Sequence, residues 1–145
     1  MINNYTKNNL LPPPDKKKYS KDHMLLLIFI YYFKNLLSIG DIQQVLDPLE
    51  EKYFKTDKSL NLEDIYNEIS LLKNQELEHI SQGIRRMYED SMASFEHDGT
   101  EDEDKVFLKL FAFISLLSYD VNIKKQLVER IIDRFFRPDE PDKKK

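Results

Sequence analysis

Few side chains in this sequence stand at spacings that suit metal chemistry. Glu76 and His79 have the Glu-x-x-His spacing that one helix of a di-iron site contributes, but such a site needs a second pair and two further glutamates, and no second pair exists. The acidic residues at 98 and 101–104 lack the alternating ligands and terminal glutamate of an EF-hand loop. Carboxylates in a first helical turn are already explained by the helix dipole. We therefore expect no metal site and no cofactor.

Groups for covalent or phosphoryl chemistry are also scarce. The chain has no cysteine and only three glycines, and it contains no glycine-rich phosphate loop. Its serines stand mostly at expected helix caps or in loops, so a nucleophilic triad has no support. We expect that the protein is not an enzyme.

Basic and amide side chains near the start of the chain could instead contact nucleic acid. Lys16, Lys17 and Lys18 precede the aromatic Tyr19 in a short segment between two expected helices. Mobile positive charge suits phosphate contact, because that contact needs no base-edge geometry. Residues 1–22 carry five lysines and two aspartates, a local charge of +3, so the other 123 residues carry −7 of the total of −4. Three lysines are also common in an ordinary solvated loop, and that alternative stays open.

The first 46 residues resemble a known DNA-binding domain. The resemblance to MerR-type regulators, from their recognition helix onward, rests on Tyr5, Lys7, Leu10-Leu11-Pro12-Pro13, Tyr19-Ser20, Leu27, Ile30 and Ser38-Ile39-x-Asp41-Ile42-x-x-x-Leu46. The segments MINNY, KKKYS and LLSIGDI more closely resemble a MerR-like bacterial family known only as a domain of unknown function, number eighteen thirty-six.

This resemblance implies a partial winged helix-turn-helix that reads double-stranded DNA as a homodimer on a two-fold operator. Asn3, Asn4 and Lys7 match the exposed part of the recognition helix, where asparagine can pair with adenine edges. Lys16, Lys17, Lys18 and Tyr19 match the wing, which meets the phosphate backbone. Both families place another helix before the segment that matches residues 2–5, so Met1 is expected to be an internal methionine of a longer protein.

Helix boundaries are well marked, and they predict an all-α fold. A short helix over residues 2–8 must end before Pro12, Pro13 and Pro14. Ser20, Ser38 and Asn61 each stand between apolar residues at the two positions that staple a helix start. Asp47-Pro48 predicts a cap with a first-turn proline, and Thr100 with Glu103 has capping-box spacing. Six further helices are expected, over 20–36, 39–46, 48–55, 62–95, 101–118 and 121–136, with no strand beyond a short wing.

Apolar patterning predicts how these helices pack. The ten-residue run 24–33 is too short for a membrane span of about 20 residues, so it predicts a helix buried on all sides. The run 106–119 is apolar almost all round and is expected to be internal. In the helix from Leu62, two apolar stripes are out of phase across residues 73–76, which favours a bend or break.

Together these features predict a partial MerR-like DNA-binding domain over 1–47, a helical bundle and dimerisation region over 48–136, and a disordered tail over 137–145. A composition of 41% hydrophobic and 33% charged residues fits a helical globular domain. The absence of cysteine and of a signal peptide fits a cytoplasmic protein without membrane association. Two functions remain: a MerR-like DNA-binding transcriptional regulator, or a helical protein-interaction module that does not bind DNA.

Overall fold

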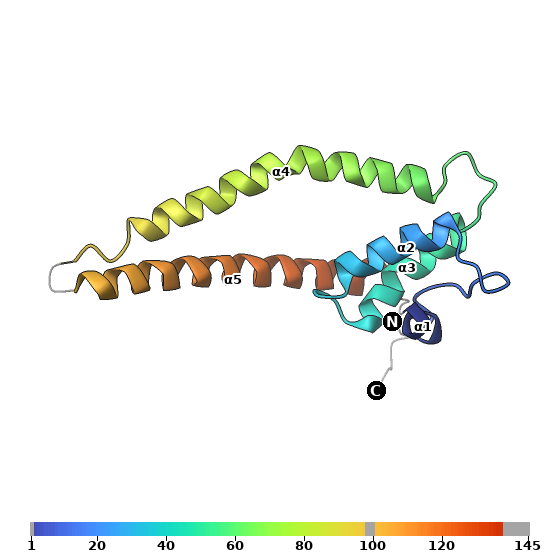
Figure 1. Ribbon diagram of the computed structural model, residues 1–145, viewed down its shortest axis with the longest axis horizontal. Coiled ribbons are helices and arrows are strands. Elements are labelled where there is room, and N and C mark those ends of the chain that lie inside the picture. Colours follow the sequence, from blue (N-terminus) through green and yellow to red (C-terminus); the bar gives the residue numbers. More distant parts are fainter. Residues whose placement is uncertain (1, 98–100, 138–145) are drawn as a thin grey trace, which may run out of the picture. The chain divides into compact units, whose positions relative to one another are not determined.

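The computed structural model describes residues 2–97 and 101–137, and in this part of the chain the fold is all-α. Its five helices are α1 (Ile2–Lys7), α2 (Lys21–Phe33), α3 (Ile39–Tyr53), α4 (Leu62–Met92) and α5 (Asp102–Phe135) (Figure 1). The one extended pairing in the described residues is an isolated antiparallel bridge between Asp15 and Lys18. The prediction of an all-α fold is confirmed, whereas the winged helix-turn-helix stays a prediction.

The chain divides into two compact units. The first contains Met1–Ile69 together with Lys125–Lys145, and the second contains Ser70–Lys124. Helices α4 and α5 therefore each contribute one part to the first unit and another to the second. The boundary expected between residues 47 and 48 falls inside α3.

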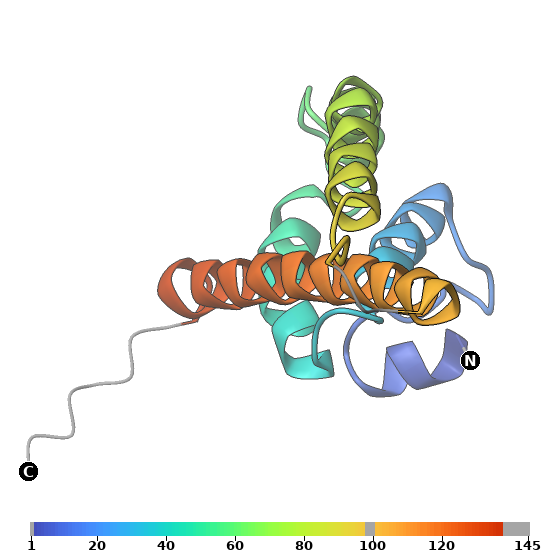
Figure 2. The same cartoon turned by 90° about the vertical axis from the view of Figure 1, so that its left-hand side faces the viewer.

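The first unit has a continuous hydrophobic core. Helices α1, α2 and α3 lie close together in both ribbon views (Figures 1 and 2). The end of α5 adds Ile132, which is 2% exposed, and Arg137 just beyond it pairs with Asp41 at 2.9 Å. The buried apolar residues are Leu10, Leu11, Leu25, Leu26, Phe29, Ile30, Leu37, Ile42, Leu46, Leu62 and Ile132. Residues that follow the second unit along the chain thus complete this core.

Three of the predicted helix starts are confirmed. The Ser20 hydroxyl accepts a hydrogen bond from the His23 amide, and the Ser38 hydroxyl accepts one from the Asp41 amide at 3.1 Å. Asn61 and Asp64 form a reciprocal capping box, with both bonds at 3.0 Å. These caps satisfy amide groups that a helix leaves unpaired at its start. Thr100, the predicted cap of the helix from residue 101, and Asp98, part of the acidic run before that helix, lie outside the described residues.

Two predicted helix breaks were wrong. Pro48 lies inside α3, so residues 39–46 and 48–55 are not separate helices. The apolar face of α3 continues on both sides of Pro48, since Leu46 is buried and Leu49 packs against the same core. This burial offsets the loss of the backbone hydrogen bond that proline cannot donate. Helix α5 likewise runs through Asp120, which pairs with Lys124 at 2.8 Å on the helix surface instead of capping a new helix.

A bend or break was expected in the fourth helix, and a tail was expected from residue 137. Helix α4 is continuous from Leu62 to Met92, so it has no break across residues 73–76. The predicted tail begins with Arg137, whose guanidinium is ordered by ion pairs with Asp41 and Asp133. Residues 138–145, the rest of that tail, lie outside the described residues.

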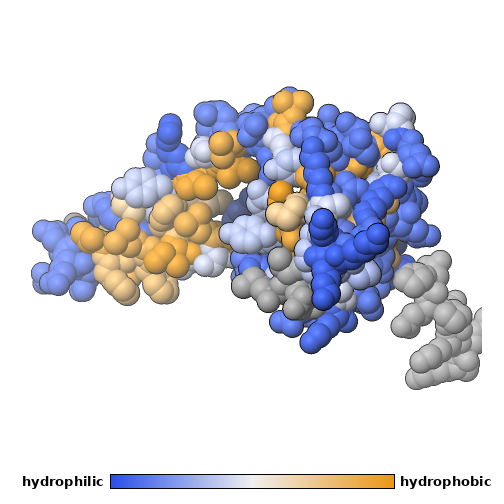
Figure 3. Space-filling model, turned by 45° about the vertical axis from the view of Figure 1, so that its right-hand side comes forward, coloured by the Kyte–Doolittle hydropathy of each residue, from blue (hydrophilic) through white to orange (hydrophobic). Residues whose placement is uncertain are grey.

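Exposure of the apolar helices differs from the expectation as well. Helix α2 buries Leu26 and Ile30 but leaves Tyr31 63% and Tyr32 53% exposed, so it is not buried on all sides. Helix α5 was expected to be internal over 106–119, yet Phe107 is 63% and Ile114 62% exposed. Hydrophobic side chains gather over the second unit in the space-filling view (Figure 3).

By length and composition, α5 could also span a membrane, because an 18-residue window within it has a mean hydropathy of 1.6 and none of that window is buried. The core helix of a soluble protein can meet the same criterion.

Candidate nucleic-acid interface

The lysine run forms the tip of a tight turn. The Lys18 amide donates a hydrogen bond to the Asp15 carbonyl at 2.8 Å, which closes a loop with Lys16 and Lys17 at its centre. Both central residues have positive φ, 47° and 64°, as in the type I′ turns that join two strands. Glycine and asparagine are preferred at such positions, because a lysine side chain is strained there. The chain therefore keeps two lysines where they weaken the local backbone.

The ammonium groups at this tip face solvent. Lys16, Lys17 and Lys18 are all exposed and make no ion pair among the described residues. Nearby Lys21 differs, since it pairs with Glu63 at 2.7 Å. The turn is thus a small positive projection, and no carboxylate within residues 2–97 and 101–137 pairs with its three ammonium groups.

His23 connects this turn to helix α2. Its ring is fully buried, and Nδ1 accepts a hydrogen bond from the Ser20 amide at 3.0 Å, with the Ser20 hydroxyl also 2.8 Å away. Nδ1 therefore carries no proton, and Nε2 donates to the Pro13 carbonyl at 3.2 Å. One neutral imidazole joins the segment before the turn to the segment after it.

Aromatic rings pack on both sides of this histidine. Tyr19 and Phe54 make edge contacts with the His23 ring, with centroids 5.3 and 4.9 Å away. Asp22 accepts a hydrogen bond from the Lys55 amide at 2.7 Å, which joins the start of α2 to the segment after α3. The base of the turn is held firmly, although its tip is free.

Helix α1 is fixed to the core by the residues that follow it. The Leu10 and Leu11 amides both donate to the Tyr5 carbonyl, at 2.8 and 3.3 Å, and the two leucine side chains are buried. Tyr5 packs against the same core. Asn4 and Lys7 are exposed on this helix, whereas the side chain of Asn3 lies outside the described residues. Both ribbon views show α1 and the following loop on the same side of the first unit (Figures 1 and 2).

The residues singled out in the sequence lie on two segments of the first unit. Lys7 and Asn4 are on α1, the lysine run forms the turn before α2, and Tyr19 follows this turn and contacts His23. Sequence reasoning gave no role to His23. His23 stands at the third position after the Ser20 cap, where a side chain can accept a hydrogen bond from the backbone amide of the cap residue. This position is the signal that could have identified it.

The metal candidates do not assemble. His79 lies 3.5 Å from Glu76, but both side chains are largely exposed on α4. Within residues 2–97 and 101–137, no group of three histidine, aspartate or glutamate side chains could hold a metal ion.

Comparison with known proteins adds one finding. Residues 1–69 match the model of a family described as a domain of unknown function, DUF1836. No curated protein and no solved structure matches the chain. The matched segment contains α1, the lysine turn, α2, α3 and the start of α4, but not the part of α5 that completes their core.

Proposed function

We propose that the protein is a MerR-like DNA-binding transcriptional regulator, in which residues 1–47 form part of a winged helix-turn-helix. The observation that carries this proposal is the turn at Lys16 and Lys17. Strained backbone that survives in a structure often marks a functional site, since a less strained residue would stabilise the fold. A turn that presents three unpaired ammonium groups matches the chemistry of a wing on the DNA backbone.

Helix α1 would supply the base contacts of this interface. Asn4 and Lys7 are exposed on α1, and Asn3 belongs to the same helix. An asparagine amide can donate to and accept from an adenine edge in the major groove, whereas lysine suits guanine or a phosphate. Phosphate contacts from the turn would then set the orientation of α1 on the duplex.

Dimerisation through the second unit supports the same proposal. Its two helix segments contact each other through Tyr88 and Phe113, and through an ion pair between Glu96 and Lys109. No apolar side chain is buried in the described part of residues 70–124. Two helices without a core gain stability when a second copy covers their apolar surfaces, and a two-fold dimer also suits a two-fold operator.

The test is binding of the full chain to a duplex of random sequence at several salt concentrations. Replacing Lys16, Lys17 and Lys18 together with alanine should weaken binding to every duplex about equally. The log-log salt slope should become shallower by up to about 3 units, because each phosphate contact contributes roughly 0.9. The matched control replaces Lys34, Lys52 and Lys58, which removes the same charge elsewhere in the first unit.

Site selection from a random library then tests α1. Replacing Asn3 or Asn4 should reduce affinity for the selected site by about 1 to 3 kcal/mol and leave random DNA nearly unchanged. An unchanged salt slope in the triple lysine variant would refute the wing assignment.

The second candidate is a helical protein-interaction module without DNA binding. The exposed apolar surface of the second unit favours it, because large apolar patches usually mark protein interfaces. This candidate is preferred if the wild-type chain shows no salt-dependent binding to any duplex.

A further inference from the structure

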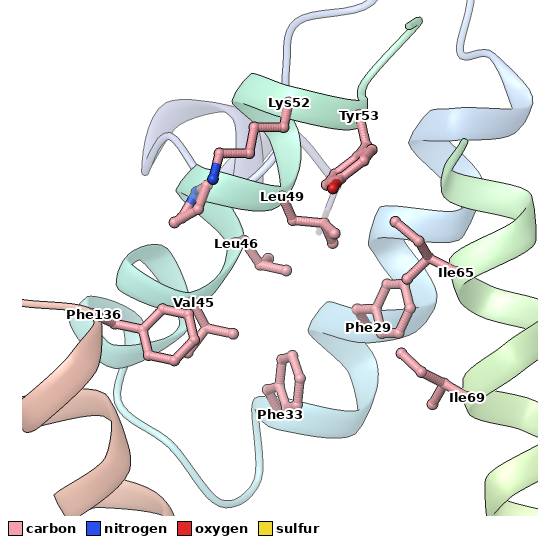
Figure 4. Close-up of a pocket in the computed structure, with 11 residues that line it drawn as sticks. Phe29, Phe33, Val45, Leu46, Leu49, Lys52, Tyr53, Ile65, Ile69 and Phe136 are labelled. Atoms are coloured by element: carbon pink, nitrogen blue, oxygen red, sulfur yellow. The ribbon is translucent and has the colours of Figure 1, made fainter. Parts of the chain in front are cut away.

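An apolar pocket lies within the first unit, away from the lysine turn. Its volume is about 330 Å³, and its walls include Phe29 and Phe33 from α2, Val45 and Leu49 from α3, and Ile65 and Ile69 from α4 (Figure 4). Volumes from about 300 Å³ upward are typical of small-molecule sites. All of its lining residues belong to the first unit.

The lining is nearly devoid of polar groups. Of its eleven residues, only Lys52 and Tyr53 carry polar side-chain atoms. Ordered water needs two to four polar partners, and most of this surface offers none. An apolar occupant is therefore favoured over water for the greater part of the pocket.

Lys52 and Tyr53 are neighbours on the last turn of α3, but their side chains point to different sides of the helix, and the rings of Phe29 and Phe33 lie farther along the pocket (Figure 4). Lys52 is exposed at the edge of the pocket and makes no ion pair among the described residues. Among the residues that line the pocket, Lys52 alone is charged. One cation at the edge of an apolar cavity is complementary to an acid group on a hydrocarbon or aromatic body.

We propose that this pocket binds a small amphipathic carboxylate, with its apolar body against Phe29, Phe33 and Leu49 and its carboxylate at the edge of the pocket near Lys52. The volume fits a molecule of roughly 10 to 15 non-hydrogen atoms. This site goes beyond DNA binding, and it stands whether or not the chain binds DNA.

Titration of the full chain with decanoate and with decanol, in the absence of DNA, tests the proposal. The readout is calorimetry together with the methyl NMR signals of Val45, Leu49, Ile65 and Ile69. Decanoate should bind saturably and shift these signals. Lys52→Met should weaken decanoate binding about tenfold, as expected for loss of one charge-assisted contact, and leave decanol binding unchanged.

Two further variants separate the pocket from other sites. Leu49→Trp fills the cavity from its half-buried wall and should abolish the methyl shifts with both ligands. Lys125→Met removes a lysine from α5 that does not line the pocket, so it should bind decanoate like the wild type.

Three results would overturn the proposal. One is the absence of saturable binding. Another is decanoate binding that Leu49→Trp does not change, which would place the ligand on the exposed apolar surface of the second unit. The third is a decanoate titration that dissociates the chain's own dimer in sedimentation while it shifts these methyl signals, which would show that a second copy of the chain occupies the pocket. None of these results depends on the lysine turn, so they leave the DNA-binding proposal to its own test.

Discussion

Replacing Phe111 with serine should dissociate the proposed dimer without unfolding the chain. Phe111 is 57% exposed on α5 and lies beside Phe107, with ring centroids 6.0 Å apart. Because the ring is largely outside any core, its loss removes little from the fold of one copy. Serine in an exposed helix position reduces helix stability by only about 0.5 kcal/mol relative to better helix formers.

The expected loss of affinity follows from the exposed area. A phenylalanine that is 57% exposed offers about 110 Å² of apolar surface. At about 25 cal/mol per Å², its burial contributes about 3 kcal/mol per copy, and a two-fold dimer loses this twice. Buried area does not convert fully into affinity, so we take half of the total, about 3 kcal/mol, which weakens the dimer about 100-fold.

Sedimentation equilibrium over a wide range of protein concentration measures this change directly. Tyr31→Ser is the matched control, since Tyr31 is 63% exposed but lies on α2 in the first unit. Far-ultraviolet circular dichroism checks that both variants keep their helices. The reasoning is refuted if the wild type is a monomer at tens of micromolar, or if Phe111→Ser and Tyr31→Ser associate equally well.

Two further predictions concern stability. Replacing Lys16 with Asn and Lys17 with Gly should raise the melting temperature by a few degrees, because each strained lysine destabilises the turn by about 1 kcal/mol. The same change should lower the affinity for DNA. A lower melting temperature would contradict the strain argument. Burial, helped by the negative charge of Asp47, raises the pKa of Glu50 from its ordinary value of 4.5 to about 7. Glu50 therefore stabilises the fold below about pH 4.5, and this contribution is lost as the pH rises through 7. Urea denaturation measures the free energy of unfolding of the wild type and of Glu50→Gln at both pH values. With allowance for the partial exposure of Glu50, the gain from Glu50→Gln should be about 1 to 2 kcal/mol larger at pH 8 than at pH 5. An equal effect at both pH values would contradict the raised pKa.

Local signals in the sequence predicted the local structure well. Ser20, Ser38 and Asn61 were recognised as caps because a capping bond depends only on the next three residues. The all-α class followed from the same short-range patterns. Pro48 shows where such reasoning fails, since the burial of Leu46 and Leu49 against other helices outweighs the local preference for a break.

Features that join distant segments could not be predicted in the same way. The partner of His23 Nε2 is a carbonyl ten residues earlier, which no spacing rule identifies. The pocket takes its walls from α2, α3, α4 and Phe136, so it exists only after these elements have packed. The positive φ values of Lys16 and Lys17 were also hidden, because the usual glycine or asparagine of such a turn is missing.

The second unit is inserted into the first, and this connectivity links the proposed dimer to the candidate DNA surface. Helix α4 begins in the core of the first unit with Leu62, and α5 returns to that core with Ile132. Residues 70–124, which carry the exposed apolar surface, therefore connect two helix segments that the first unit needs for its own packing. A second copy that orders these helices would also favour the packed state of the unit that carries α1 and the lysine turn. Association and DNA binding would then support each other through the two helices that run continuously from one unit into the other.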